Sequence, residues 1–149
     1  MAGAKDAGSL GSMIPVTDTN VVNGLSPYNW VCKADYISTT VCSASVNIGF
    51  KGTRRVALHV DTEHFKKATG NQKRYPIIAW SVNGGVFQSH QLADGENTVL
   101  LASNAVNPII DLYVKGMSPF EPRYVGDVPG SAVKIIGFAV DPGGAMAPA

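Results

Sequence analysis

Residues 75–92 read Tyr75-Pro-Ile-Ile-Ala-Trp-Ser-Val-Asn-Gly-Gly-Val-Phe-Gln-Ser-His-Gln-Leu92. Ile78, Trp80 and Val82 fall on one face of an extended segment, which is the pattern of a strand with one side in a core. Asn83 and Gly84 form the dipeptide that tight hairpin turns favour, because both residues tolerate positive φ angles. The stretch therefore predicts a β-hairpin that turns at Asn83-Gly84, with Trp80 in the core.

Other segments show the same alternation of apolar and polar residues, at 44–50, 56–60, 108–115 and 133–140. In the last of them, Gly137 separates two apolar pairs, which predicts a β-bulge that turns both pairs into the core. The sixteen glycines and nine prolines supply many turns, and the only segment that we expect to form a helical turn is 62–70. The predicted fold class is all-β, an antiparallel β-sandwich of the jelly-roll type.

The length and composition indicate one globular domain. The chain has 149 residues, of which 45% are hydrophobic and 15% are charged, and its net charge is +1. This charge argues against a nucleic-acid partner, since domains that bind nucleic acid usually concentrate basic residues. No apolar run reaches the length of about 18 residues that a membrane span needs. We expect a flexible arm at residues 1–12, a single domain at 13–144 and a tail at 145–149.

The two cysteines, Cys32 and Cys42, lie ten positions apart. Either they close a small loop as a disulfide or they are two reduced thiols, because pairing depends on geometry that a sequence does not show. Two cysteines without clustered histidines do not predict a zinc site. The aspartates form no metal-binding motif either, so we expect no metal and no cofactor.

Seven short motifs together resemble the N-terminal accessory domain of bacterial SGNH/GDSL-type esterases. In chain order they are Pro15-Val-Thr-Asp18, Ser26-Pro-Tyr-Asn-Trp30, Val60-Asp-Thr62, Arg74-Tyr-Pro76, Trp80-Ser-Val-Asn-Gly-Gly85, Leu112-Tyr-Val-Lys115 and Val133-Lys-Ile-Ile-Gly-Phe-Ala-Val-Asp-Pro-Gly143. The resemblance covers nearly all of residues 14–144. It implies a jelly-roll sandwich with the shape of a carbohydrate-binding module.

The chain departs from these esterases in two ways. Their catalytic domain opens with a Gly-Asp-Ser nucleophile motif, whereas this chain ends at Ala149 and its only Gly-Asp pair is followed by Val128. Where the family carries Asp-Arg-Trp, this chain has Pro122-Arg123-Tyr124. None of the histidines follows a motif of the kind that a catalytic triad requires. We therefore expect a protein that is not an enzyme.

Sugar recognition needs an exposed aromatic ring that can stack on a pyranose and planar polar groups that can bind its hydroxyls. Among the aromatic residues Trp30, Tyr75, Trp80, Tyr113 and Tyr124, we expect Trp80 to lie in the core. The predicted carbohydrate-binding residues are Trp30, Tyr75, Arg74, Arg123, Tyr124 and Asp61.

Two functions fit these observations and do not exclude each other. One is a non-catalytic binding or attachment module that recognises a glycan. The other is a structural decoration protein on a larger assembly such as a virus capsid. In the second case residues 1–12 and 145–149 would make contacts in a homo-oligomer or a larger protein assembly. Either function would be carried out extracellularly or on a virion surface.

Overall fold

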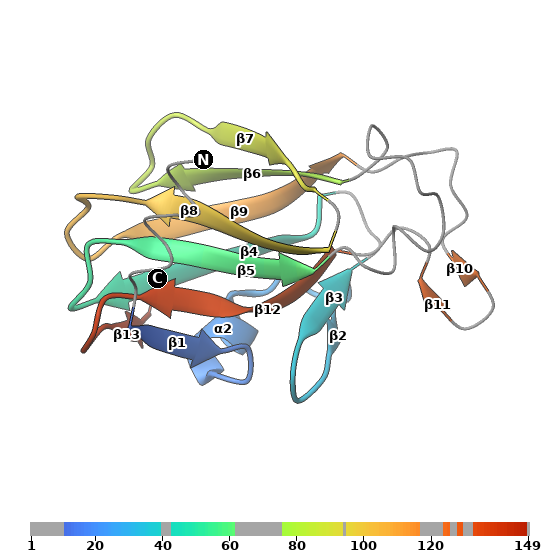
Figure 1. Ribbon diagram of the computed structural model, residues 1–149, viewed down its shortest axis with the longest axis horizontal. Helices are drawn as coiled ribbons and strands as arrows, with labels where there is room; N and C mark the ends of the chain where they lie inside the picture. Colours follow the sequence, from blue (N-terminus) through green and yellow to red (C-terminus); the bar gives the residue numbers. More distant parts are fainter. Residues whose placement is uncertain are drawn as a thin grey trace.

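The chain folds into two antiparallel sheets that pack face to face (Figure 1). The computed structural model describes residues 11–39, 43–61, 76–93, 95–116, 124–125, 128–129 and 133–148. No helix within these ranges is long and apolar enough to cross a membrane.

The first sheet, called sheet A, runs in the order β2-β3-β12-β5-β8, and β1 also pairs with β12. Its strands are β1 (Ser12–Pro15), β2 (Val31–Cys32), β3 (Ile37–Thr39), β5 (Val56–Asp61), β8 (Glu96–Ala102) and β12 (Val133–Val140). The second sheet, called sheet B, runs in the order β13-β4-β9-β6-β7. Its strands are β4 (Ser45–Lys51), β6 (Ile77–Val82), β7 (Gln88–Gln91), β9 (Ile109–Gly116) and β13 (Ala145–Ala147).

The strand orders β3-β12-β5-β8 and β4-β9-β6-β7 are those of an eight-stranded jelly roll. The fold class that the sequence predicts is therefore confirmed. A short pair, β10 (Tyr124–Val125) with β11 (Val128–Pro129), lies outside both sheets.

The core lies between the sheets and contains the predicted apolar faces. Phe50 of β4 and Phe138 of β12 meet edge to face there, with ring centroids 6.0 Å apart. Trp80 is only 5% exposed, and its indole N–H donates to the carbonyl of Leu101 at 2.9 Å. The indole thus has the hydrogen-bond partner that a buried tryptophan needs, and its predicted core position is confirmed.

The predicted turn at Asn83-Gly84 and the predicted bulge are also confirmed, but the connection is longer than a tight hairpin, because β7 begins only at Gln88, which pairs with Trp80. Asn83 and Gly84 have φ angles of 52° and 74°, and the N–H of Gly85 donates to the carbonyl of Val82 at 3.0 Å. In β12 the register shifts between Ile135 and Gly137, so apolar side chains on both sides of the shift are buried.

One helix contradicts the expectation that residues 62–70 hold the only helical turn. It is α2 (Thr19–Gly24), and the Asp18 side chain caps it by accepting from the N–H of Asn20 at 2.9 Å. Six residues are too few for a helix to be stable alone, so packing against β4 must hold it, with Val21 buried. The segment 62–70 itself lies outside the described residues.

The expected tail at 145–149 is in part a strand. Residues 145–147 form β13, which pairs with Gly49, Phe50 and Lys51 of β4. Met146 is 6% exposed and lies in the core, which gives this segment an anchor. Of the expected arm at 1–12, residues 1–10 lie outside the described part, and Ser12 pairs with Val140 in sheet A.

A carboxylate holds the loop between β4 and β5 against the end of β12. Asp141 accepts from the backbone N–H of Arg54 at 2.9 Å and of Arg55 at 3.2 Å. It also accepts from the Arg55 guanidinium at 2.9 and 2.8 Å and from the Thr53 hydroxyl at 3.1 Å. The N–H of Arg54 above all, with the help of Arg55 and Thr53, lowers the pKa of Asp141 from 3.8 to about 2.

Candidate functional site

The aromatic residue Trp30, predicted to bind sugar, is tied into the fold. Its indole N–H donates to the carbonyl of Ser45 at 3.0 Å, and its ring packs against the core. The Ser26 hydroxyl accepts from the N–H of Ser45 at 2.9 Å and so holds the same loop on β4. These contacts account for Trp30 without a ligand, and its role in sugar binding stays a prediction.

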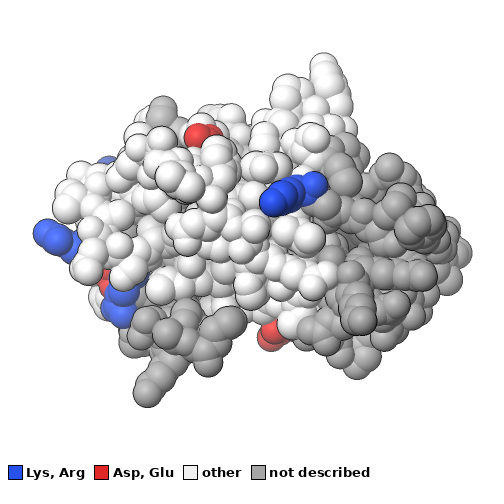
Figure 2. All heavy atoms as spheres, turned by 90° about the horizontal axis from the view of Figure 1, so that it is seen from above, with Lys and Arg blue, Asp and Glu red and all other residues white. Residues whose placement is uncertain are grey.

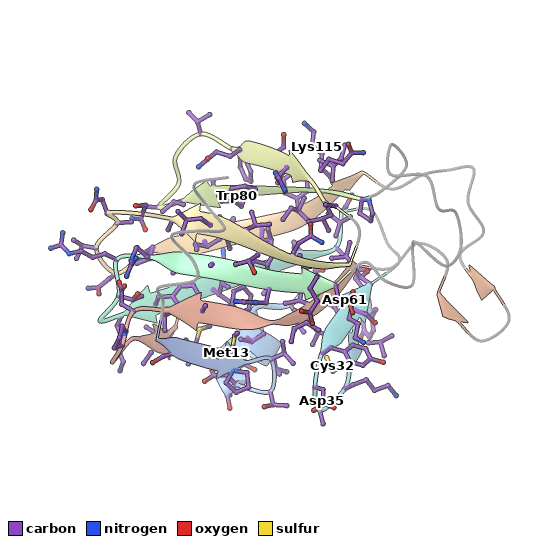
Figure 3. All side chains as sticks on the ribbon, in the orientation of Figure 1. Met13, Cys32, Asp35, Asp61, Trp80 and Lys115 are labelled. Atoms are coloured by element: carbon purple, nitrogen blue, oxygen red, sulfur yellow. The ribbon has the colours of Figure 1, made fainter. Side chains whose placement is uncertain are left out.

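Asp61 lies on the outer face of sheet A, on the side of the molecule that carries the β2–β3 hairpin (Figure 3). It stands opposite Lys134 of β12 and Glu96 of β8 in one cross-strand row. In the next row, the hydroxyl of Thr98 lies 3.5 Å from Nδ1 of His59. Burial lowers the pKa of His59, and the Glu96 carboxylate opposes that shift. The role of Asp61 in sugar binding stays a prediction.

Several other predicted positions lie outside what the structure describes. Arg74, Tyr75 and Arg123 are outside the described residues, and for Tyr124 only the backbone, in β10, is described. Cys32 is exposed at the end of β2, and Cys42 lies outside the described residues. The disulfide between them stays a prediction.

The outer face of sheet B carries a different set of polar side chains, in a row across three strands. Asn47 of β4 stands opposite Asp111 of β9, which stands opposite Ser81 of β6. The Asn47 amide donates to the Asp111 carboxylate. Since neighbouring strands lie about 4.8 Å apart, the row spans roughly 10 Å. It presents an amide and a carboxylate side by side, whereas the Ser81 side chain at its end is buried.

An aromatic pair adjoins this row. Tyr113 lies two positions after Asp111 on β9, opposite Ser45 on one side and Ala79 on the other. Phe87, in the connection between β6 and β7, meets Tyr113 edge to face with ring centroids 5.5 Å apart. Phe87 is 52% exposed and Tyr113 is half-buried. The two rings form an apolar surface that water still reaches.

The turn that carries Phe87 is held in place from the side. The side-chain oxygen of Asn83 accepts from the N–H of Ile109 at 2.8 Å, and the N–H of Asn83 donates to the carbonyl of Ile109 at 2.8 Å. Asn83 thus continues the ladder between β6 and β9 beyond the last paired residue. The loop after it starts from a fixed point, which gives the Phe87 ring a defined position.

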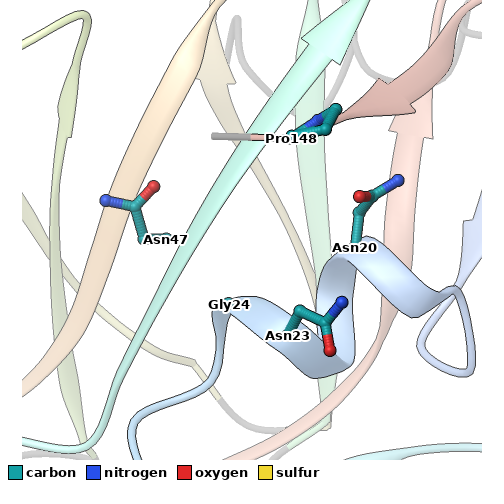
Figure 4. Close-up of a pocket in the computed structure, with 5 residues that line it drawn as sticks. All are labelled: Asn20, Asn23, Gly24, Asn47 and Pro148. Atoms are coloured by element: carbon teal, nitrogen blue, oxygen red, sulfur yellow. The ribbon is translucent and has the colours of Figure 1, made fainter.

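A pocket opens at the edge of sheet B, between α2, β4 and the end of β13 (Figure 4). Its volume is about 450 Å³, and Asn20, Asn23, Gly24, Asn47 and Pro148 line it. Asn20 and Asn23 project from α2, whereas the Asn47 amide lies on the side of β4 away from that helix. Asn47 therefore borders both this pocket and the polar row.

In Figure 2, which views the molecule from the top of Figure 1, the Lys, Arg, Asp and Glu side chains of the described residues are few and lie apart from one another. The lining of the pocket contains no charged residue. Within the described part of the chain, no group of three or more His, Cys, Asp or Glu side chains could hold a metal ion.

The arrangement suits binding by stacking and hydrogen bonding. Exposed rings beside amide and carboxylate groups can hold a flat molecule that is apolar on its faces and rich in hydroxyls at its edge. We call Asn47, Phe87, Asp111 and Tyr113 the sheet B platform.

Sequence reasoning considered Tyr113 among the aromatic residues, and missed the rest of this site. Asn47 and Asp111 alternate with core residues, so their outward direction could be predicted from the sequence. Their pairing could not, because 64 positions separate them. For Phe87 the signal is its place just after Asn83-Gly84, a turn that leaves the following residues exposed.

The comparisons with known proteins identify the fold. No family model matches the chain, and no curated protein sequence matches it. An acetyl xylan esterase from the rumen bacterium Butyrivibrio proteoclasticus has a solved structure that aligns with 95% of this chain, with a TM-score of 0.63 and 14% identity. This fold occurs in carbohydrate esterases.

Two further structures agree. A family two carbohydrate esterase from Cellvibrio japonicus aligns with 87% of the chain, with a TM-score of 0.62 and 11% identity. One from Clostridium thermocellum, in complex with cellohexaose, aligns with 80%, with a TM-score of 0.58 and 13% identity. The chain spans 34%, 33% and 31% of the lengths of these three proteins. The resemblance to an esterase accessory domain is thus confirmed for the fold.

Proposed function

We propose that the chain is a non-catalytic module that binds carbohydrate on the sheet B platform. The observation that carries this proposal is the position of the Phe87–Tyr113 pair beside Asn47 and Asp111. The rings offer apolar faces for the C–H surface of a sugar ring. The amide and the carboxylate offer acceptors and donors for its hydroxyls.

The structural neighbours support a carbohydrate ligand. One was solved in complex with cellohexaose, one is an acetyl xylan esterase, and a third is active on acetylated mannans. Each of these ligands and substrates is a polysaccharide or a fragment of one. A module of this kind would act outside the cell, where polysaccharides are found.

The non-catalytic part of the proposal rests on the surroundings of the described histidines. The ring of His59 has the Thr98 hydroxyl as its neighbour and lies on sheet A, away from the platform. His90 lies in β7 opposite Ile78. An acyl-transfer site needs a serine within hydrogen-bond reach of a histidine base, and neither ring forms a hydrogen bond with a serine of the described ranges. The chain should therefore release no acetate from p-nitrophenyl acetate above the rate of the buffer.

The binding proposal is tested by calorimetric titration of the wild-type chain and the Tyr113→Ala variant with cellohexaose, xylohexaose and mannohexaose. We expect at least one of these oligosaccharides to bind the wild type. Tyr113→Ala should weaken that binding about 10- to 100-fold, since aromatic stacking contributes roughly 1–3 kcal/mol per ring. Phe87→Ala, in an exposed loop, is a second variant that spares the sheet. Equal affinity of wild type and both variants would show that the platform is not the binding site.

A further inference from the structure

The pocket between α2, β4 and β13 is a cavity that the sheet B platform does not use. Its volume of about 450 Å³ falls within the range of roughly 300–1,000 Å³ that small-molecule sites occupy. The platform is an open surface, whereas this pocket has walls on two sides. The wall on one side is the helix, and that on the other is the end of β13 at Pro148 (Figure 4).

The helix presents two amides to this pocket. Asn20 and Asn23 are three positions apart on α2, so they lie on the same side of the helix. Among the described residues, neither side-chain amide takes part in a hydrogen bond, whereas the backbone N–H of Asn20 donates to the Asp18 carboxylate. Each amide therefore keeps two donors and one acceptor oxygen for a ligand.

Asparagine is a weak helix former, because its side chain competes for backbone hydrogen bonds. In a helix of six residues, two such positions weaken an element that is already short. No contact within the described chain offsets that cost, so the amides are available for binding.

The pocket selects against charge. None of its lining residues is charged, so an anionic ligand would lose its hydration without gaining a cation as a partner. Two carboxylates adjoin the lining, that of Asp18, which accepts from the N–H of Asn20, and that of Asp111, which accepts from Asn47, and both repel anions. The ligand that fits is neutral and carries several hydroxyls. Like water, these hydroxyls can both donate hydrogen bonds to the amides and accept hydrogen bonds from them.

From these observations we infer that the pocket is a second binding site, for one neutral sugar ring, and that Asn20 and Asn23 hold it. Gly24 keeps the helix close to β4, and Pro148 supplies the apolar wall. Asn47 connects this site to the platform, so a longer chain would extend from the pocket across the sheet. The inference rests on the proposed carbohydrate function and specifies the class of carbohydrate, which is uncharged glycans.

Side-chain amide NMR signals test this inference directly. Asn20→Ala and Asn23→Ala assign the two NH₂ pairs, and neither variant removes a core contact. The probes are the methyl glycosides of glucose, xylose and mannose, then cellohexaose, xylohexaose and mannohexaose, and hexagalacturonate as the anionic counterpart. We expect a neutral glycoside to shift the NH₂ signals of Asn20 and Asn23 both in the wild type and in Tyr113→Ala.

The double variant Asn20→Ala/Asn23→Ala should bind the hexasaccharide about tenfold more weakly, as expected for two lost hydrogen bonds.

The outcomes separate this inference from the proposed function. If a hexasaccharide perturbs the signals around Tyr113 while those of Asn20 and Asn23 stay fixed with every probe, the pocket is not a sugar site and the platform stands. Shifts at the pocket alone would support the inference and count against the platform. Silence at both sites would overturn both, and equal shifts with hexagalacturonate would overturn the preference for neutral ligands.

Discussion

At Gly24 the backbone of α2 passes so close to β4 that the fold has no room for a side chain. A Cβ atom there would lie 2.0 Å from the carbonyl oxygen of Asn47 and 3.0 Å from its carbonyl carbon. Both neighbours are backbone atoms, which cannot rotate away. The residue therefore fixes how closely the helix approaches the sheet, and with it the width of the pocket.

Gly24→Ala should destabilise the protein by about 1–3 kcal/mol, the usual cost of forcing an extra carbon into a tightly packed site. Denaturant unfolding followed by circular dichroism measures the difference. Asn23→Ala is the matched control on the same helix: it should leave stability unchanged or raise it by up to about 0.5 kcal/mol, because alanine favours helix. If Gly24→Ala unfolds at the same denaturant concentration as the wild type, α2 is not docked as described.

Trp30 could stabilise the fold or bind sugar. Its contacts indicate a structural role, whereas its sequence context indicates sugar binding. Trp30→Phe keeps an aromatic ring and removes the hydrogen bond to Ser45. It should cost about 1–2 kcal/mol of stability, from the lost hydrogen bond and the smaller ring, and leave glycan affinity unchanged. Weaker glycan binding at unchanged stability would instead support Trp30 as a ligand contact.

Among the elements, the link between the β4–β5 loop and the end of β12 depends on pH. The pKa of Asp141 is about 2 in the folded chain against 3.8 for the ordinary carboxyl. A lowered pKa means that the ionised form stabilises the fold. That contribution is complete above about pH 4 and is lost as the pH falls towards about 2. With 23% of the side chain exposed, we take it as on the order of 1–2 kcal/mol.

Asp141→Asn should therefore be less stable than the wild type at pH 7, and the gap should narrow between pH 4 and pH 2. Thermal unfolding of both proteins from pH 2 to pH 7 measures this gap. Asp35→Asn, in the exposed turn between β2 and β3, is the control and should follow the wild-type curve. A gap that stays constant down to pH 2 would mean that Asp141 is not held by its ionised form.

The sequence predicted the elements whose conformation depends on the local preferences of their own residues. Asn83-Gly84 set the hairpin turn, and Gly137 marked the bulge of β12. It did not predict α2, since Asp18 at a helix start looks the same as Asp18 at a turn until β4 covers Val21. It did not predict β13 either. Met146 is a single apolar residue, and its segment becomes a strand because it pairs with the open edge of β4.

At the scale of the molecule, the two sheets present unlike outer faces. Sheet A carries a charged row that includes Asp61 and Lys134, and sheet B carries the platform with Asp111. The sequence could assign Asp61 and Asp111 to outward faces by alternation alone. It could not tell which face would lie beside exposed rings, because that depends on how strands distant in the chain are paired. The candidate site therefore depends mostly on how strands that are distant in the chain pair within sheet B.

The two aspartates form a matched pair for a binding experiment. Both sit on outer faces and both are partly exposed. Asp111→Asn should weaken glycan binding about three- to tenfold, by weakening a charged acceptor, whereas Asp61→Asn should bind as the wild type does. Titration with the oligosaccharide that binds best compares them. The reverse result would move the site to sheet A and restore the sequence-based choice of Asp61.

β13 also gives the sandwich a mechanical weak point. A force pulling on the chain beyond Pro148 would reach the fold through this short strand, which pairs with β4 over three residues. Because these paired residues are few, β13 should detach from β4, and Met146 should leave the core, before the two main sheets unfold. Because Pro148 forms one wall of the pocket, tension would open that pocket first. Traction on this end of the chain would thus loosen the hold on a ligand while the rest of the fold remained intact.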